Sequence, residues 1–269
     1  MITHFGPYLS QRKLPCLVCL SILSIVASLL AQSSTLSATT YFFSGFETGD
    51  VSAWLAENGG NHTGGGYITT EKSHSGTFCW KAYNNPNLPY PDNISAKLLR
   101  WRFDYNEAYY SAWYFWPADY IVSGEGGQYV NIFQWKERAS PWDPTWVVAV
   151  KNSYQYPGED EIVLHDFHGA KIIRNGVKLP KGRWFRLEAF LKTGRTYGQI
   201  IVWLDGQQIF SMSNINTSGN PSNTTGYLMW GVGNYGDAGI GKYIYVDDAV
   251  VADHRVLISP PIGLRVVDH

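Results

Sequence analysis

Residues 130–138, with the sequence VNIFQWKER, have the residue types and spacing of a β-strand that carries polar side chains on one face. Alternation along an extended strand divides them into two sets, Ile132, Gln134 and Lys136 on one face and Asn131, Phe133 and Trp135 on the other. The amide of Gln134 and the ammonium of Lys136 would then stand about 7 Å apart. Such a face either meets solvent or lines a binding site, and the sequence leaves both interpretations open.

The segments that must position these residues have the sequence pattern of many short strands. Runs rich in β-branched and aromatic residues alternate with period two, and each is closed by Gly, Pro, Asn or Asp. The Asn-Gly pair in RNGV and the Asp-Gly pair in LDGQQ favour tight hairpin turns. No convincing amphipathic helix is found. The pattern predicts one all-β domain over residues 41–258, a two-sheet antiparallel sandwich or jelly roll, followed by a tail over 259–269.

The N-terminal 33 residues have a different character. Arg12 and Lys13 precede the apolar run LPCLVCLSILSIVASLLA, which is followed by small polar residues. This layout predicts a secretory signal peptide, cleaved near residues 31–33, with an uncleaved N-terminal anchor as the alternative. The expected location is therefore extracellular, with no membrane attachment after cleavage. Of the three cysteines only Cys79 would remain, which predicts no internal disulfide.

Charge and composition indicate a class of partner. The formal charge is −1, and removing Arg12 and Lys13 with the leader gives −1 − 2 = −3, which argues against nucleic acid. The chain has 11 Trp and 18 Tyr. Aromatic rings stack on the C–H faces of sugar rings, so this excess favours a carbohydrate partner, unless most of these rings are core. Four sequons would accept glycans in a eukaryotic secretory pathway: Asn61, Asn93, Asn216 and Asn223.

Several segments carry a family resemblance. LPKGRWFRLEAFLKTG, GQIIVWLDGQQIF, GVGNYG and YIYVDDAVV resemble the polysaccharide lyase family that includes heparin lyase I-like and glucuronan lyase-like proteins. YYSAWYFWPADY and NIFQWKER fit that family's earlier strands, so the resemblance spans roughly residues 41–253. It implies a concanavalin A-like jelly roll whose concave sheet binds a glycan chain. Gln134 and Lys136 would lie on a middle strand of that sheet, with Phe133 and Trp135 facing the core.

The resemblance also implies a reaction, the β-elimination of a uronic-acid polymer. The sugar carboxylate must be neutralised, a base must take the C5 proton, and an acid must protonate the departing O4. Gln134 would hydrogen-bond the carboxylate, and Lys136 would add positive charge. Tyr235, in GVGNYG, matches the family's tyrosine, and His74 and His165 are the candidate bases. The expected substrate-binding residues are Arg100, Arg102, Asn131, Trp146 and Asn234.

The sequence departs from the family at one position. Related lyases often carry a basic residue two positions before the glycine that precedes the tyrosine, and here that position is Gly231. A cation beside a tyrosine lowers the pKa of its phenol, so the glycine removes one means of activating this tyrosine. The alternative interpretation makes Tyr235 structural and His74 a turn residue beside Gly76.

A metal site is also predicted, where the first and last strands are expected to pair. Glu47 and Asp50 follow the first strand, and Asp247 and Asp248 lie in the last. Carboxylates gathered there would suit a structural Ca²⁺, which related sandwiches often carry. The alternative is a solvated strand end.

These observations favour one function over two others. The preferred hypothesis is a secreted, monomeric polysaccharide lyase acting on an acidic, uronic-acid-containing polysaccharide. The alternative is a non-catalytic carbohydrate-binding module, lectin-like or laminin G-like, on the same fold. A glycoside hydrolase ranks last, because the expected concave strands show no pair of facing carboxylates.

Overall fold

The computed structural model describes residues 39–55, 61–103, 105–122, 128–137, 144–156, 158–167, 169–218 and 228–256, with only the backbone of 61–63, 101–103, 137, 144 and 228. The strands are β1 (Thr40–Ser44), β2 (Asn61–Thr63), β3 (Tyr67–Thr69), β4 (Cys79–Tyr83), β5 (Ser95–Phe103), β6 (Glu107–Phe115), β7 (Val130–Glu137), β8 (Pro144–Asn152), β9 (Asp160–Asp166), β10 (Lys171–Ile173), β11 (Trp184–Lys192), β12 (Gly198–Leu204), β13 (Gln207–Ile215), β14 (Leu228–Tyr235) and β15 (Tyr243–Ala252). The helical turns are α2 (Ser52–Leu55), η1 (Asp92–Ile94) and η2 (Asp237–Gly239).

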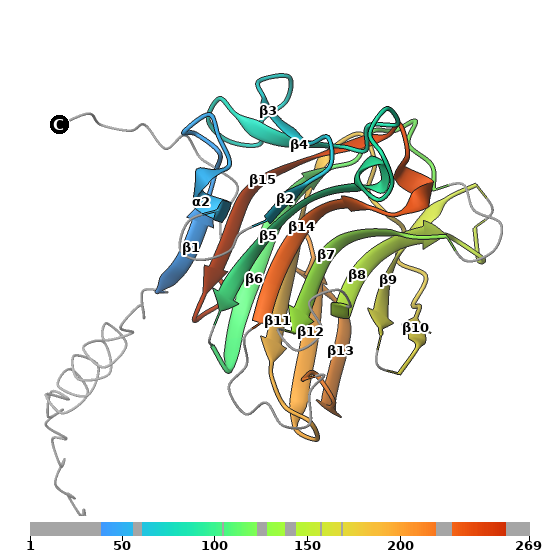
Figure 1. Ribbon diagram of the computed structural model, residues 1–269. Helices are drawn as coiled ribbons and strands as arrows, with labels where there is room; N and C mark the ends of the chain where they lie inside the picture. The colour runs from blue at the N-terminus through green and yellow to red at the C-terminus, as the bar shows by residue number, and fades with distance from the viewer. Residues whose placement is uncertain are drawn as a thin grey trace, which may run out of the picture. The chain divides into compact units, whose positions relative to one another are not determined.

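The strands form two antiparallel sheets packed face to face (Figure 1). One sheet has the order β13-β12-β11-β6-β15-β4-β3, with β1 also pairing with β15. The other has the order β10-β9-β8-β7-β14-β5-β2, and its strands curve along their length (Figure 1). Runs of consecutive strands, β11 to β13 and β7 to β10, lie beside strands from distant parts of the chain, such as β15 next to β6 and β14 next to β7, as crossovers between the sheets require. The predicted all-β jelly roll is confirmed.

The core between the sheets is rich in aromatic side chains. Six tryptophans are fully buried, Trp54, Trp80, Trp116, Trp135, Trp146 and Trp230. Each such side chain removes a large apolar area from water and stabilises the fold by about 1.5–3 kcal/mol or more. More than half of the chain's 11 tryptophans therefore belong to the core, which agrees with the alternative that most of the aromatic rings are core residues.

A bulge in β7 corrects the predicted alternation. In the pairing with β8, Asn131 lies opposite Ala149 and Phe133 opposite Val148, so Ile132 is an extra residue on the β7 side. An extra residue shifts the alternation by one position. Ile132 consequently joins the core cluster, and Asn131 moves to the face predicted for Gln134 and Lys136.

Three of the sequence-based predictions fall outside the residues that the structure describes. These include the signal peptide over 1–33, the sequon at Asn223 and the tail over 259–269, which stay predictions. Among the helices of the described part of the chain, none is long and apolar enough to cross a membrane.

Candidate functional site

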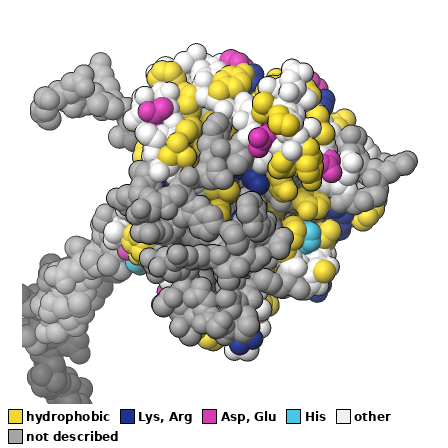
Figure 2. Space-filling model, viewed as in Figure 1, with side chains coloured by type: hydrophobic (Ala, Val, Ile, Leu, Met, Phe, Trp, Pro, Cys, Tyr) yellow, Lys and Arg dark blue, Asp and Glu magenta, His cyan; other side chains and the backbone are white. Residues whose placement is uncertain are grey.

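One side of the seven-stranded sheet faces away from the core and carries a group of polar side chains, which we call the polar face. Its members alternate with core residues such as Leu98, Phe133, Trp135, Val150 and Leu164. They are Lys97 on β5, Asn131, Gln134 and Lys136 on β7, Lys151 on β8, His165 on β9 and Tyr235 on β14. Figure 2 shows basic and histidine side chains beside hydrophobic ones over this sheet.

The strand order brings the predicted amide and phenol together. β14 lies between β5 and β7, with Tyr235 opposite Asn131 and Gly231 opposite Gln134. One face of the sheet therefore carries Gln134 and Lys136 together with Tyr235, which comes from a strand about one hundred positions later in the chain. Gln134 and Lys136 are buried, with 3% and 6% exposure, so this face of β7 does not simply meet solvent.

Lys97 completes this group, although the sequence analysis did not select it. It lies opposite Gly233 on β14, and its Nζ stands 3.7 Å from the centre of the Tyr235 ring. Burial is the main cause that lowers the pKa of the Lys97 ammonium to about 7, and repulsion from Lys136 adds to it. A lysine whose pKa is lowered this far can be neutral near pH 7 and accept a proton.

Glycines on β14 allow this close arrangement. A Cβ at Gly231 would clash with Leu99 Cδ2 and stand 3.2 Å from Gln134 Nε2. Any side chain at this position would require the side chains of Leu99 and Gln134 to shift. A Cβ at Gly233, whose φ is 151°, would clash with the carbonyl oxygen of Ala96. The cation beside Tyr235 comes instead from the neighbouring strand, as Lys97.

The two amides of the polar face lack hydrogen-bond partners among the described residues. Both polar side-chain atoms of Gln134 and both of Asn131 are buried without one. An unsatisfied buried polar group costs about 1–3 kcal/mol, so native proteins seldom keep several together without a use. Two such amides beside two lysines are suited to hold a ligand carboxylate.

His165 lies on the polar face but at a distance from this group. Its cross-strand neighbour is Val147, whose other neighbour is Gln134, so two strand spacings, about 10 Å, separate the two backbones. Its ring packs against the Phe167 ring, with 3.9 Å between centres and an angle of 31° between the ring planes. Burial, and secondarily Lys151, lowers the pKa of the imidazole. The structure therefore does not place His165 beside Tyr235.

The other candidate base, His74, lies in the loop between β3 and β4, against the eight-stranded sheet. Its ring stacks on Trp113 at 3.8 Å, and its Nδ1 is 2.7 Å from Asp248 Oδ2. Trp113 alternates with the core residues Ala112 and Tyr114 and so points away from the core. His74 is thus on the outer face of the opposite sheet, where the alternative role as a turn residue fits its contacts.

Three predicted substrate-binding residues point into the protein. Arg100 donates to the carbonyl oxygen of Ala53 in α2 and lies over the Phe42 ring, on the core side of β5. Trp146 is a core side chain, 1% exposed. Asn234 is fully buried and accepts a hydrogen bond from the Tyr120 hydroxyl. Positions 96, 98 and 100 of β5 face inward, which is why Lys97 and not Arg100 reaches the polar face. Arg102 lies in β5, but its side chain is outside the described residues.

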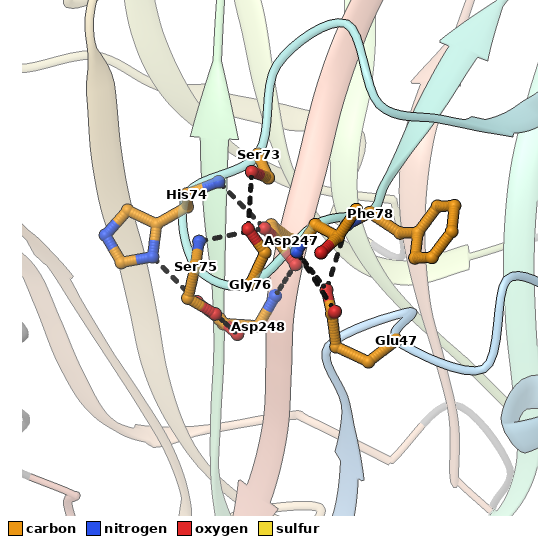
Figure 3. Close-up of polar contacts among 9 residues, drawn as sticks. Glu47, Ser73, His74, Ser75, Gly76, Phe78, Asp247 and Asp248 are labelled. Atoms are coloured by element: carbon orange, nitrogen blue, oxygen red, sulfur yellow. Dashed lines mark hydrogen bonds and ion pairs between the residues drawn. The ribbon is translucent and has the colours of Figure 1, made fainter. Parts of the chain in front are cut away.

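The acidic residues at the paired termini hold a turn (Figure 3). Both carboxylate oxygens of Glu47 accept from Thr77 N at 3.0 Å, and Oε1 also accepts from Phe78 N. Asp247 Oδ2 accepts from the backbone N–H groups of His74 and Ser75.

The two remaining predicted ligands are occupied in the same way. Asp248 Oδ1 accepts from the Ser75 hydroxyl, and Asp50 accepts from the N–H and hydroxyl of Ser52 at the start of α2. No group of three or more His, Cys, Asp or Glu arranged to hold a metal ion occurs in the part of the chain that the structure describes. Oxygens that face N–H donors do not match a Ca²⁺ site, whose ligands all direct lone pairs at the ion. The calcium site stays a prediction.

Replacing Glu47 with alanine tests the structural role. We expect the free energy of unfolding to fall by about 1–2 kcal/mol, because two backbone donors lose a charged acceptor. Urea unfolding measures this change, with Glu159→Ala on the exposed end of a hairpin as the control. If EDTA destabilised the wild-type protein and not the Glu47→Ala variant, the residue would be a metal ligand instead.

Comparisons with known proteins agree on the fold. No family model matches the chain, and no curated protein matches it in sequence. A double variant of alginate lyase Aly36B in complex with alginate trisaccharide superposes with a TM-score of 0.55 at 12% identity, covering 82% of this chain and 96% of that one. A variant of the same lyase with a lysine and a tyrosine replaced by alanine, in complex with alginate tetrasaccharide, gives 0.51 at 12% identity, covering 82% and 95%. Alginate lyase vAL-1 from Chlorella virus gives 0.48 at 13%, covering 73% and 91%.

Proposed function

We propose that the protein is a polysaccharide lyase that cleaves a uronic-acid-containing polysaccharide by β-elimination, with the polar face as its active site. The observation that carries the proposal is the pair formed by Lys97 and Tyr235, 3.7 Å from ammonium to ring centre. A buried lysine with a pKa of about 7 in contact with a phenol is suited to proton transfer near neutral pH. The resemblance of the fold to alginate lyases supports the same reaction class.

Binding of the uronate carboxylate falls to the amides. The amide groups of Gln134 and Asn131 are buried and have no partner among the described residues, and Lys136 lies two positions from Gln134 on the same strand. Hydrogen bonds and positive charge at the carboxylate stabilise the negative charge that develops when C5 loses its proton. Because these groups are already in place and shielded from water, little reorganisation is needed.

Two proton transfers complete the reaction. Neutral Lys97 takes the C5 proton, and the electrons of the C5–H bond form the C4–C5 double bond. The C4–O4 bond breaks, and Tyr235 donates its proton to the departing O4. The phenolate is then adjacent to the newly charged Lys97 ammonium, which stabilises it until the proton returns.

The direct test is an assay for the unsaturated product. Purified protein is incubated with glucuronan, alginate, heparin and hyaluronan, and the ultraviolet absorbance of the double bond conjugated with the carboxylate is followed. We expect product from at least one polymer. Absence of product from every uronic-acid polymer defeats the proposal, and retention on a polysaccharide column without product would favour the non-catalytic carbohydrate-binding alternative.

Replacing Gln134 with leucine separates activity from stability. We expect kcat to fall by about 10²-fold, because one donor to the developing charge is lost. The same change removes two unsatisfied buried polar atoms and is expected to leave the free energy of unfolding unchanged or raise it by up to about 1 kcal/mol. A variant with lower stability and unchanged kcat would show that Gln134 is a structural residue.

A further inference from the structure

A cavity of about 290 Å³ opens at one end of the polar face. Its described lining comes from η1 and the turn before it, from the residues that precede β7, and from the end of β14: Tyr90, Ile94, Gln128, Tyr129, Tyr235, Gly236 and Asp237. On β14, the partners of Gln134 and Lys136 lie earlier in the strand, at Gly231 and Met229. Tyr235, which pairs with Asn131, therefore stands between Gln134 and the cavity.

The two sides of Tyr235 differ in charge. The only charged side chain among the described lining residues of the cavity is the exposed carboxylate of Asp237. Two lysines lie close by, but each is positioned over a tyrosine ring: Lys97 over Tyr235 and Lys151 over Tyr129, at 3.7 and 5.2 Å from the ring centres. Neither lysine lines the cavity.

The lining is suited to an uncharged sugar. Three tyrosine rings offer faces for the C–H surface of a pyranose and hydroxyls for its oxygen atoms, and Gln128 adds an amide. Burial, with the neighbouring Tyr235 and Asp237, raises the pKa of the Tyr129 phenol, so this hydroxyl remains a donor. A carboxylate in the cavity would instead meet Asp237.

We infer that this cavity binds a sugar without a carboxylate, joined to the uronate through O4, and that the substrate is a polysaccharide in which uronate and neutral sugar alternate. The inference rests on the proposed function. Tyr235 protonates O4, and O4 belongs to the bond between the uronate and its neighbour. That neighbour must lie directly beyond Tyr235, where the cavity is.

Kinetics on defined polymers test this inference. Hyaluronan and unsulfated chondroitin carry an N-acetylhexosamine on O4 of each glucuronate, whereas in glucuronan and alginate the neighbour is another uronate. We expect kcat/KM at least about 10-fold higher on the alternating polymers. Equal or higher kcat/KM on the homopolymers overturns the inference and leaves the proposed function standing.

Binding to the inactive Tyr235→Phe variant gives a readout that needs no turnover. Hexasaccharides of hyaluronan and glucuronan are compared by calorimetry, and tighter binding of the hyaluronan fragment is expected. If neither fragment binds, or if the glucuronan fragment binds more tightly, the inference is wrong. This result does not depend on whether the wild-type protein forms product.

Two variants locate the effect in the cavity. Asp237→Asn is expected to raise kcat/KM on glucuronan by about 5-fold and to leave hyaluronan within about 2-fold, because only a carboxylate is repelled. Tyr90→Ala is expected to lower kcat/KM on hyaluronan by about 5-fold, since one stacking face is lost. Tyr90 is 76% exposed, so its removal should not affect folding. Asp119→Asn, an exposed aspartate in the turn after β6, is the matched control, and equal effects from it and Asp237→Asn refute the inference.

Discussion

If the proposed function is right, the Tyr235→Phe variant is expected to lose about 10³-fold in kcat on a polysaccharide that yields product, with KM changed by less than about 3-fold. The ring stays in place, so its contact with the Lys97 ammonium and its packing are retained. Only the proton that Tyr235 gives to O4 is lost. A poor leaving group that departs without a proton makes bond cleavage slow, while binding of the ground state is nearly unchanged. Initial rates of double-bond formation over a range of polymer concentrations measure both constants.

The control for this change is Tyr197→Phe. Tyr197 is 64% exposed and lies in the loop before β12, away from the polar face. Its variant should keep the wild-type kcat and the wild-type melting temperature. If Tyr235→Phe also keeps its kcat, another group protonates O4, and the role given to the phenol is wrong. If kcat falls together with the melting temperature, the effect is one of folding.

The fold could be predicted from the sequence because period-two alternation is a local property. Segments such as WFRLEAFLK and GQIIVWL alternate in the sequence, and in β11 and β12 alternate residues of each enter the core. The site was predicted in part: Gln134, Lys136 and Tyr235 lie on one face, as expected. The role of each in catalysis remains a proposal.

The errors have two physical origins. The bulge at Ile132 shifts the alternation by one residue through backbone geometry, and no residue type in this segment predicts a bulge. Arg100 was expected among the substrate-binding residues, yet alternation places position 97 and position 100 on opposite faces of β5. Using the core residue Leu98 as the reference point would have selected Lys97.

The sequence of a single strand does not show to which of the two sheets, or to which face of a sheet, its residues belong. His74 and His165 both stand in strand-and-turn segments, and only the sheet order shows that His74 belongs to the outer face of the opposite sheet. Trp146 shows the same limit for one strand: its indole was expected at the sugar, but its position in β8 alternates with Val147, so it lies in the core.

Replacing Lys97 with methionine is expected to lower kcat/KM by about 10³-fold and to change the shape of its pH dependence. In the wild-type protein only neutral Lys97 accepts the C5 proton, and its pKa is about 7. The wild-type kcat/KM should therefore rise about tenfold per pH unit below pH 7 and level off above it. The residual activity of Lys97→Met should lack this rise. A wild-type profile that is flat between pH 5.5 and 8.5 would show that another group is the base.

The same variant has the opposite effect on stability, which distinguishes a catalytic lysine from a structural one. The pKa of Lys97 is lowered by folding from 10.5 to about 7, so between these values the unfolded chain binds the additional proton and the free energy of unfolding rises with pH. Below pH 7 the protonated lysine is buried at its full cost. Lys97→Met removes that cost and should be more stable than the wild type, by on the order of 3 kcal/mol at pH 6, with a smaller difference at pH 9. Urea unfolding at the two pH values measures both. A lysine kept only to stabilise the fold would make the methionine variant less stable at pH 6, whereas a buried base that reduces stability is retained because the reaction needs it.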